Sequence, residues 1–564
     1  MHQREDRTGE GRSALRRWGP LALVLAIVAG VTAVAFTGGD DGADGGGGGS
    51  AASTATTAPI ELPEGVVTWS MAQADDLDVE FPDTCDEETG RIAIPFFFRT
   101  ECFADVEENG GATAPGVTAD SIKVVAWLPA EDDPVRSLLL ERIGFEASNE
   151  ELKEVYEGFV EIFQRHYQTY GREVELEFIE ATGTIFDSAA ARADAVRADE
   201  EMGAFAVLGG PVIGSAWTDE LHARGIVCIA CPGISGGEPT VFTLPPSNNQ
   251  IRSHMANYVS RKLAGKPAEF AGEELQDDER VFGHLALGLS EGDQERAEEF
   301  EQRLADVDVD LAEQVIYPLD PSRAAELATS GIASMQAAGV TSVLVQADPI
   351  LLPAFTQEAT KQQWFPEWVL AAPPFVDTTA FARTFDQEQW AHAFGLSYFP
   401  PPVDPEVNPP IQLYEWFYGS PPPVEGTIPL LLLYPQVTLF FTGLEYAGPD
   451  LTAETFRDGL FVMPPTPRAV TQPQVNYGEE LGEEGIYAGI EDMVEVWWDS
   501  EGEGPDEAGD EGRGVYRYVD GARRSSAEDW TDEVRVFDAD GAVTAVEDLP
   551  EDEVPPDYPS PADD

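Results

Sequence analysis

Apolar runs of strand length alternate with helical patterns along most of the chain. The clearest example begins with the apolar run Ala204–Leu208, which Gly209 and Gly210 end. A helical pattern follows Ser215, and a second apolar run covers Ile226–Ala230. A strand, a glycine turn, a short helix and a second strand make a βαβ unit, whose parallel strands are buried on both faces.

The turns that follow these two strands are the expected ligand site. In open α/β sheets, ligands bind beyond the carboxyl ends of the strands, where helix N-termini direct their free N–H groups. The two turns are Gly209–Ser215 and Pro232–Gly237. Because they end consecutive strands of one βαβ unit, we expect them to lie side by side.

The same alternation occurs in two series, separated by Thr240–Ser247, which has the extended pattern of a crossover. Two βα series joined by a crossover predict an α/β fold of two lobes with a cleft between them. The segment Pro129–Phe145 is long for a connection between a strand and a helix, and we expect it to cover part of the cleft. The other expected strands are Ser121–Leu128, Glu173–Ile179, Val281–Gly288, Glu313–Tyr317, Ser342–Gln346, Trp368–Ala371 and His392–Phe399. A long helix is expected later in the chain, at Pro429–Tyr446.

The first residues carry the pattern of a membrane anchor. Arg12, Arg16 and Arg17 precede Pro20–Phe36, an uncharged apolar run close to the roughly 17 to 25 residues that a membrane helix needs. The arginines are expected to stay in the cytoplasm, which places the body of the protein outside. A cleaved signal peptide is the alternative, because Ala33–Ala35 fits a small-residue cleavage site.

The four cysteines form two pairs in the sequence. Outside the cytoplasm, Cys85 and Cys102 bracket a short apolar segment and are expected to form a disulfide. Cys228 and Cys231 form a C-x-x-C motif at the end of a strand, which favours a local disulfide or two buried thiols. The sequence has no second C-x-x-C motif, and its histidines are scattered, so we expect no metal site.

The charge is strongly negative, since 33 Lys and Arg against 104 Asp and Glu give a formal net charge of −71. Such a chain repels phosphates, so nucleic acid is not an expected partner. The acidic residues are spread over the predicted helix faces and the tail, which favours a solvated surface rather than a cation site.

One motif would fit an enzyme. Gly233–Gly237 matches G-x-S-x-G, the nucleophile elbow of serine hydrolases, with Ser235 as nucleophile and His392 as a base. The elbow requires a helix directly after it, whereas an extended segment with Pro239 follows here. A turn that binds a carboxylate or phosphate is the better interpretation. We expect no catalytic residue and no cofactor.

Several phrases resemble the type I periplasmic binding proteins, the leucine/isoleucine/valine-binding family. The likeness covers roughly residues 116 to 530 and leaves out the membrane segment and the cysteine-bearing extension. Its phrases are the opening strand Gly116–Ala130, the first turn Val207–Trp217, the second turn Ala230–Ser235, the crossover Val241–Gln250 and the late helix Pro435–Gly448.

The resemblance implies a protein that captures a small solute between two hinged lobes and delivers it to an ABC-type permease. The family's ligand-binding turns fall at Gly214 and Ser215, and at Gly233 and Ser235. Both turns would offer N–H and hydroxyl donors to a carboxylate.

The second lobe departs from the family pattern. Pro373 stands where the ammonium-binding glutamate is expected, so an ordinary branched-chain amino acid is an unsafe assumption. Asp348 is a candidate partner for a cationic ligand group, or an N-cap for the helix that follows. Trp127 and Trp217, near strand ends, are candidates to line the cleft, although aromatic residues at such positions are more often core.

The expected protein is therefore a monomeric, membrane-tethered solute-binding protein for an amino acid, an amide or a related carboxylate. The alternatives are a sensor or scaffold of the same fold and, less favoured, a serine esterase. The expected divisions are a cytoplasmic stub (1–17), a transmembrane anchor (18–37), a linker (38–64), a cysteine-bearing extension (65–115), the first part of lobe 1 (116–243), the first part of lobe 2 (244–374), returning segments of both lobes (375–549) and a disordered acidic tail (550–564).

Overall fold

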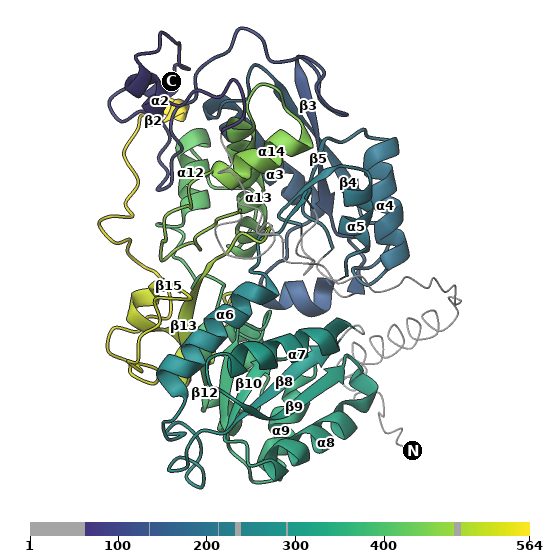
Figure 1. The fold of residues 1–564 in the computed structure, drawn as a ribbon, viewed down its shortest axis with the longest axis vertical. Coiled ribbons are helices and arrows are strands. Elements are labelled where there is room, and N and C mark those ends of the chain that lie inside the picture. Colours follow the sequence, from purple (N-terminus) through teal and green to yellow (C-terminus); the bar gives the residue numbers. More distant parts are fainter. Residues whose placement is uncertain are drawn as a thin grey trace, which may run out of the picture.

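The structure is a computed structural model that contains two α/β lobes, one above the other in Figure 1. It describes residues 62–134, 136–211, 214–231, 239–288, 292–478 and 487–563. The predicted cytoplasmic stub and membrane anchor lie outside the described residues, as does nearly all of the linker, and they stay predictions.

Lobe 1 is built on a parallel sheet with the strand order β4-β3-β5-β6-β7. Alternate residues of β3 point to opposite faces: Val124 and Ala126 pack with one core cluster, and Val125 packs with another. The short strands β5 and β6 are buried throughout, as the apolar runs predict. The strands are β3 (Ser121–Leu128), β4 (Glu173–Glu180), β5 (Ala206–Leu208), β6 (Val227–Ile229) and β7 (Val241–Phe242).

Lobe 2 is built on a larger mixed sheet with the order β14-β13-β12-β11-β10-β8-β9, and β15 pairs with β13. The strands from β8 to β12 are parallel to their neighbours, whereas β13 to β15 are antiparallel additions. The strands are β8 (Phe282–Gly288), β9 (Leu311–Pro318), β10 (Ser342–Gln346), β11 (Glu367–Ala371), β12 (Ala393–Ser397), β13 (Asp492–Pro505), β14 (Glu511–Tyr518) and β15 (Arg524–Ser526).

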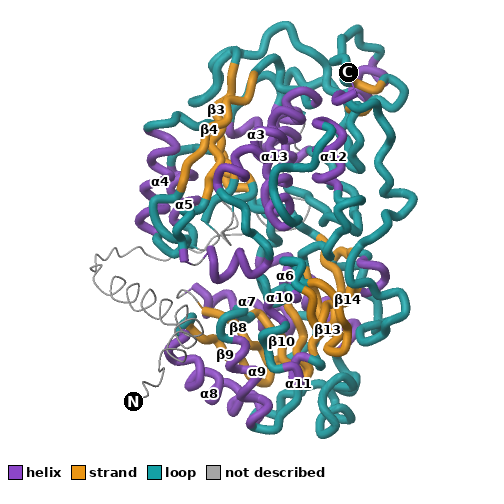
Figure 2. The backbone as a smooth tube through the Cα atoms, turned by 180° about the vertical axis from the view of Figure 1, so that it is seen from behind, coloured by secondary structure: helices purple, strands orange, loops and turns teal. Residues whose placement is uncertain are grey.

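Helices cover the sheets of both lobes (Figures 1 and 2). Side-chain and backbone bonds at Ser148 and Ser247 form capping boxes that start α3 and α6. The helices are α3 (Asn149–His166), α4 (Ser188–Glu200), α5 (Ala216–Ala223), α6 (Asn248–Tyr258), α7 (Gly292–Ala305), α8 (Ala324–Ala337), α9 (Leu352–Lys361), α10 (Thr379–Ala382), α11 (Gln387–Trp390), α12 (Pro409–Tyr418), α13 (Ile428–Ala447) and α14 (Ala453–Val462).

Helix α13 is long and apolar enough to cross a membrane by length and composition. Within the described residues, however, 72% of its apolar window is buried inside the protein. It packs against α3 and α14, and its residues Val437, Phe440 and Phe441 belong to the main core cluster of lobe 1. We therefore assign α13 as the core helix of lobe 1.

In the described part of the chain, four stretches pass between the lobes: residues 243–247, residues 398–408, residues 463–478 with 487–491, and the tail after β15, which leads from lobe 2 back to lobe 1. The first and third run side by side, because Thr243 N–H donates to the carbonyl of Tyr487 and Gly489 N–H donates to the carbonyl of Thr243. Each lobe has its own core, so these segments are positioned as a hinge.

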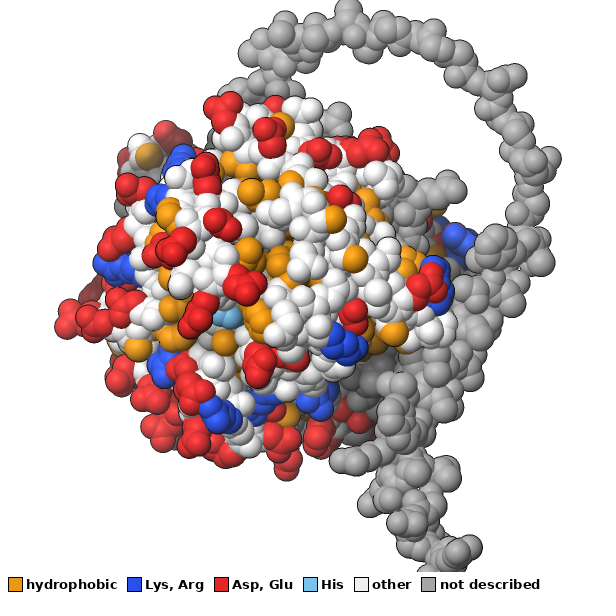
Figure 3. All heavy atoms as spheres, turned by 90° about the horizontal axis from the view of Figure 1, so that it is seen from below, with side chains coloured by type: hydrophobic (Ala, Val, Ile, Leu, Met, Phe, Trp, Pro, Cys, Tyr) orange, Lys and Arg blue, Asp and Glu red, His pale blue; other side chains and the backbone are white. Residues whose placement is uncertain are grey.

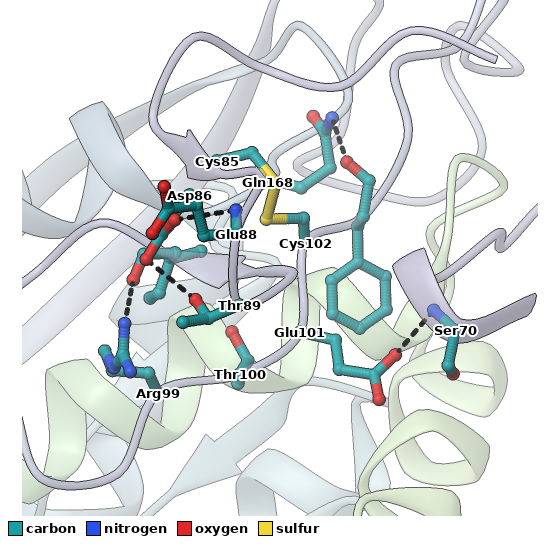
Figure 4. Close-up of a disulfide and its surroundings, with 12 residues drawn as sticks. Ser70, Cys85, Asp86, Glu88, Thr89, Arg99, Thr100, Glu101, Cys102 and Gln168 are labelled. Atoms are coloured by element: carbon teal, nitrogen blue, oxygen red, sulfur yellow. Dashed lines mark hydrogen bonds between the residues drawn. A yellow bond between two sulfur atoms is a disulfide. The ribbon is translucent and has the colours of Figure 1, made fainter. Parts of the chain in front are cut away.

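The cysteine-bearing extension forms a small unit on lobe 1, and it begins with α2 (Trp69–Asp75). Its short strands β1 (Cys85–Asp86) and β2 (Arg91–Ile92) lie beside the disulfide that joins Cys85 to Cys102 (Figure 4). Thr100 Oγ1 donates to the buried Glu445 of α13 at 2.7 Å, which ties this unit to lobe 1.

The predicted disordered tail is wrong for the described residues 550–563. Tyr558 donates from its hydroxyl to Asp86 at 2.7 Å, and Arg99 donates to the same hydroxyl. The indole of Trp416 donates to the carbonyl of Tyr558. The tail therefore returns to the extension, a contact that an acidic, proline-rich composition does not reveal.

The acidic residues are spread over the surface, as expected. Figure 3, which looks at the lobe 2 end of the molecule, shows many Asp and Glu side chains around the visible face and few basic ones. This pattern is typical of a solvated acidic surface.

Candidate functional site between the lobes

The two sheets each contain a point where the strand order reverses. In lobe 1, β3 lies between β4 and β5, and in lobe 2, β8 lies between β9 and β10. Ligands of open α/β sheets bind outside the carboxyl ends of the strands at such points. The carboxyl ends in question are Leu128 and Leu208 in lobe 1, and Gly288 and Gln346 in lobe 2.

These carboxyl ends face each other across the lobes. The loop after β4 contributes Ile185 to the core cluster of lobe 2, and Trp127 near the end of β3 packs against clusters of both lobes. From lobe 2, Phe375, which follows β11, packs against the core clusters of both lobes. The candidate site is therefore the contact region between the two strand edges.

A short helical segment crosses this region, and we call residues 136–143 the bridging segment (Figure 1). Leu139 and Ile143 are buried in the core of lobe 2, whereas Leu140 is buried in the core of lobe 1. Arg142 donates from its guanidinium to the carbonyl of Ala380 at 3.0 Å. The prediction that Pro129–Phe145 lies over the cleft agrees with this placement.

The first predicted turn is partly described. Gly209 has a φ of 72°, and a Cβ there would lie 3.0 Å from the side chain of Gln436, so this position requires glycine. Gly214, with a φ of 83°, and Ser215 are exposed at the start of α5. The Ser215 hydroxyl donates to Asp219 at 2.8 Å and does not cap the helix.

The second predicted turn, with Gly233 and Ser235, lies outside the described residues, and both stay predictions. A disulfide joins Cys228 and Cys231 immediately before it. Both cysteines are fully buried, and Ala230 between them has a φ of 50°, an unusual conformation for alanine. Of the two interpretations of the C-x-x-C motif, a local disulfide or two buried thiols, the structure shows the disulfide.

The two tryptophans differ in position. Trp217 is 1% exposed, packs in the core of lobe 1 and donates from its indole to the carbonyl of Gly209 at 3.2 Å. Trp217 therefore supports the turn from the core of lobe 1, and its contact with a ligand stays a prediction. Trp127 is partly buried between the lobes, where ligand contact remains a prediction.

Asp348 is not the N-cap that the sequence offered as its alternative, because the N-cap of α9 is Leu351; it lies in the turn just before the helix. One oxygen accepts from the N–H groups of Ile350 and Leu351 at 2.8 and 2.9 Å, and the other accepts from the hydroxyl of Tyr317 at 2.7 Å. Burial raises the pKa of Asp348. Both oxygens of Asp348 therefore stabilise the turn before α9, and contact with a cationic ligand group stays a prediction.

Asp377 is the buried carboxyl group that the sequence analysis missed. Its Oδ2 accepts from the hydroxyl of Ser397 at 2.5 Å, whereas its Oδ1 is buried without a hydrogen-bond partner among the described residues. Burial raises the pKa of Asp377 to about 7. Asp377 follows β11 and Ser397 ends β12, so this pair lies at the strand edge that faces lobe 1. A single Asp between a strand and a helix gives no sequence signal.

The esterase alternative depends on His392 as base, and its nucleophile Ser235 lies outside the described residues. His392 precedes β12 and therefore lies at the amino end of the lobe 2 strands, opposite the edge that faces lobe 1. Its ring Nδ1 contacts the carbonyl oxygen of Phe270 at 2.5 Å. No group of His, Cys, Asp and Glu that would hold a metal ion occurs among the described residues.

A hollow of about 510 Å³ opens elsewhere, at the other end of lobe 1. It is lined by Val106–Gly111 together with Tyr170 and Gly171, which precede β4. Three of its eight lining residues are glycines, and it lies at the amino end of the strands, away from the edge that faces lobe 2. We do not place the functional site there.

No family model matches the sequence, and no curated protein matches it. Among solved structures, the chain is similar to a fatty acid ABC transporter substrate-binding protein from Thermomonospora curvata, with 16% identity and a TM-score of 0.48, over 76% of this chain and 99% of that one. It is also similar to a leucine-, isoleucine-, valine-, threonine- and alanine-binding protein from Brucella ovis in a closed conformation, with 10% identity and a TM-score of 0.49, over 74% and 98%.

A third similar structure is the branched-chain amino acid transporter substrate-binding protein LivJ from Streptococcus pneumoniae in complex with isoleucine. It shares 13% identity at a TM-score of 0.45, over 71% of this chain and 100% of that one. All three are substrate-binding proteins, the class that the sequence resembles. Because their TM-scores are below 0.5, the proposals below rest on the two sheets and their facing edges instead.

Proposed function

We propose that this chain is a membrane-tethered, extracytoplasmic solute-binding protein that closes two lobes around a small polar ligand. The observation that carries the proposal is the arrangement of two sheets whose parallel strands have carboxyl ends that face each other, joined by four crossing stretches in the described chain. Such a pair of lobes moves as a hinge and binds its ligand in the crevice.

The export of the body is supported by two features. The arginines and the apolar run of the first residues favour an anchor with the body outside. Disulfides join all four cysteines of the chain, and such bonds persist in oxidising compartments outside the cytoplasm. In this location, an ABC-type permease is the proposed partner, and the chain acts as a monomer without catalytic activity.

The ligand is proposed to be an amino acid, an amide or a related carboxylate. Gly214 and Ser215 of lobe 1, with the predicted second turn, offer N–H and hydroxyl donors for an anionic end. In lobe 2, we propose that the free Oδ1 of Asp377 accepts a hydrogen bond from an ammonium or amide group of the ligand. A buried acceptor without a donor is unfavourable, and a ligand that supplies the donor removes that cost.

The experiment is thermal unfolding of the full-length protein in mild detergent with four compounds that share a 3-methylbutyl body: leucine, isovaleramide, isoamylamine and isovalerate. A ligand at a hundred times its dissociation constant adds about 2.7 kcal/mol to the free energy of unfolding. A saturable shift with at least one donor-bearing compound is expected. Flat curves for all four, with folded protein, would contradict the proposed ligand class.

Substitutions then locate the site. Ser215→Ala and Asp377→Asn are each expected to weaken the dissociation constant roughly tenfold, since a hydrogen bond to a charged group contributes about 1.5–3 kcal/mol. Glu445→Gln is the matched control, because Glu445 is also a buried acid but both of its oxygens have partners inside lobe 1. Equal weakening by the control would show a general loss of stability instead of lost contacts.

A sensor or scaffold is the second candidate function. It is favoured by the apolar contact between the lobes, where Leu139, Ile143 and Ile185 are buried in the core of lobe 2. The same unfolding experiment separates the two, because a scaffold would show no saturable ligand shift.

A further inference from the structure

The hairpin formed by β13 and β14 extends well beyond the strands that it joins. Its ladder continues from the pair Asp499 and Val515 to Pro505 and Glu511 after a bulge, in the glycine-rich stretch 502–512. Residues 506–510 form its tip. Because β12, β13 and β14 are adjacent, the hairpin belongs to lobe 2.

The hairpin holds α10, the short helix that faces lobe 1. Glu507 accepts from the N–H groups of Thr379 and Ala380 at 2.6 and 2.8 Å, which is a cap of the helix N-terminus by a side chain from the tip. Arg383 at the other end of α10 donates to the carbonyls of Gly504, Asp510 and Gly514 at 2.6, 2.7 and 3.0 Å. Helix and hairpin are therefore one unit.

Lobe 1 contacts this unit through the end of the bridging segment. A Cβ on Gly144 would lie 2.7 Å from the carbonyl oxygen of Glu507 and 3.0 Å from the Cα of Ala508, so the two backbones touch. Gly144 has a φ of 87°, which other residues rarely adopt. The guanidinium of Arg142 reaches the carbonyl of Ala380 in the same unit.

The contact between lobe 1 and this unit of lobe 2 also buries apolar side chains. Leu139 and Ile143 are each 5% exposed and belong to the hydrophobic core of lobe 2, although they lie on a loop of lobe 1. If the lobes separated, both side chains would enter water, and the burial of apolar side chains is what holds such contacts closed.

We propose that the tip of the β13–β14 hairpin, together with α10, is a latch that holds the lobes closed when no ligand is bound. The latch residues are Glu507 and Arg383 on lobe 2, and Leu139, Arg142, Ile143 and Gly144 on lobe 1. Ligand entry then requires the latch to open first, so opening limits both association and release. This inference does not depend on the identity of the ligand.

The test is a distance measurement between spin labels on the full-length protein without any ligand. Ala193→Cys on α4 of lobe 1 and Ala333→Cys on α8 of lobe 2 replace exposed residues, and all native cysteines are in disulfides. The latch predicts one narrow distance distribution, at the separation that the structure gives for the labelled pair. A ligand-free distribution dominated by longer distances would overturn the proposal.

Three variants then act on the latch. Gly144→Val places a side chain against the backbone of Glu507, Glu507→Ala removes the cap of α10, and Arg142→Ala removes an exposed guanidinium with little risk to folding. Each is expected to add a population with longer distances, whereas the neighbouring control Glu146→Ala, also exposed, is not. Folded variants that all keep the wild-type distribution would overturn the proposal.

Discussion

Buried carboxyl groups have three different environments in this protein. Asp348 has donors on both oxygens and caps a turn, Asp377 has one oxygen without a donor, and Glu445 lies completely inside lobe 1. Glu445 accepts from Thr100 Oγ1 and from the N–H of Gln168, and no described Lys or Arg forms an ion pair with it. Burial raises its pKa to about 8, so it is protonated in the folded protein at neutral pH.

This pKa predicts a loss of stability with rising pH. The folded state keeps the proton of Glu445 up to about pH 8, whereas the unfolded chain releases it near pH 4.5. The folded state therefore binds more protons in this range, and the free energy of unfolding falls as pH rises from 4.5 to 8, by roughly 4 kcal/mol from this group. Glu445→Gln is expected to show a flatter dependence.

The measurement is chemical unfolding of the wild type and Glu445→Gln at four pH values between 5 and 8. Contributions from all other groups are shared, so the difference between the two proteins isolates residue 445. The curves are expected to diverge toward pH 8, with the variant more stable. Parallel curves would show that Glu445 is ionised in the fold.

Individual site residues were predicted unevenly from the sequence. Gly209 and Ser215 follow an apolar strand and precede a helix, so their place in the turn was visible. The burial of Trp217 depends on how α5 packs on the sheet, which periodicity over one short helix does not determine. Asp377 acquires its environment from Phe375 and Ser397, on either side of a connection that no local pattern describes.

Secondary-structure elements with strong periodicity were predicted well. The predicted strand 121–128 and helix 429–446 agree with β3 and α13 to within a residue or two at each end. The outer part of the β13–β14 hairpin has no strand pattern in the sequence, because glycine and acidic residues fill it. Its order comes from Arg383 and the cap of α10, partners more than a hundred residues away.

The C-terminal segment provides a test at this scale. The hydroxyl of Tyr558 donates to Asp86 and accepts from Arg99. The guanidinium carbon of Arg99 also lies 5.6 Å from the centre of the Tyr558 ring. Tyr558→Ala is expected to loosen the extension around the Cys85–Cys102 disulfide by about 1 kcal/mol. This loosening would appear as faster amide hydrogen exchange in residues 83–102, with unchanged exchange in both sheets.

Tyr558→Phe is the conservative comparison, since it keeps the ring over Arg99 and removes only the hydroxyl. It should cause a smaller increase in exchange than Tyr558→Ala. Unchanged exchange in both variants would mean that the disulfide alone orders the extension.

The whole molecule consists of two lobes with separate cores, joined by crossing segments and held together by an apolar contact. The order of βα units in the sequence was sufficient to predict the two lobes. The way in which the lobes meet was not predictable, because Leu139, Ile143 and Ile185 are ordinary apolar loop residues until lobe 2 surrounds them.

A ligand bound between the lobes should contact both strand edges. Amide hydrogen exchange of the full-length protein measures this contact, with and without the compound that gives the largest unfolding shift. Simultaneous protection is expected after β3 and β5 in lobe 1 and in residues 372–378 of lobe 2. Protection confined to one lobe, or to the hollow around Glu107 and Gly171, would contradict it.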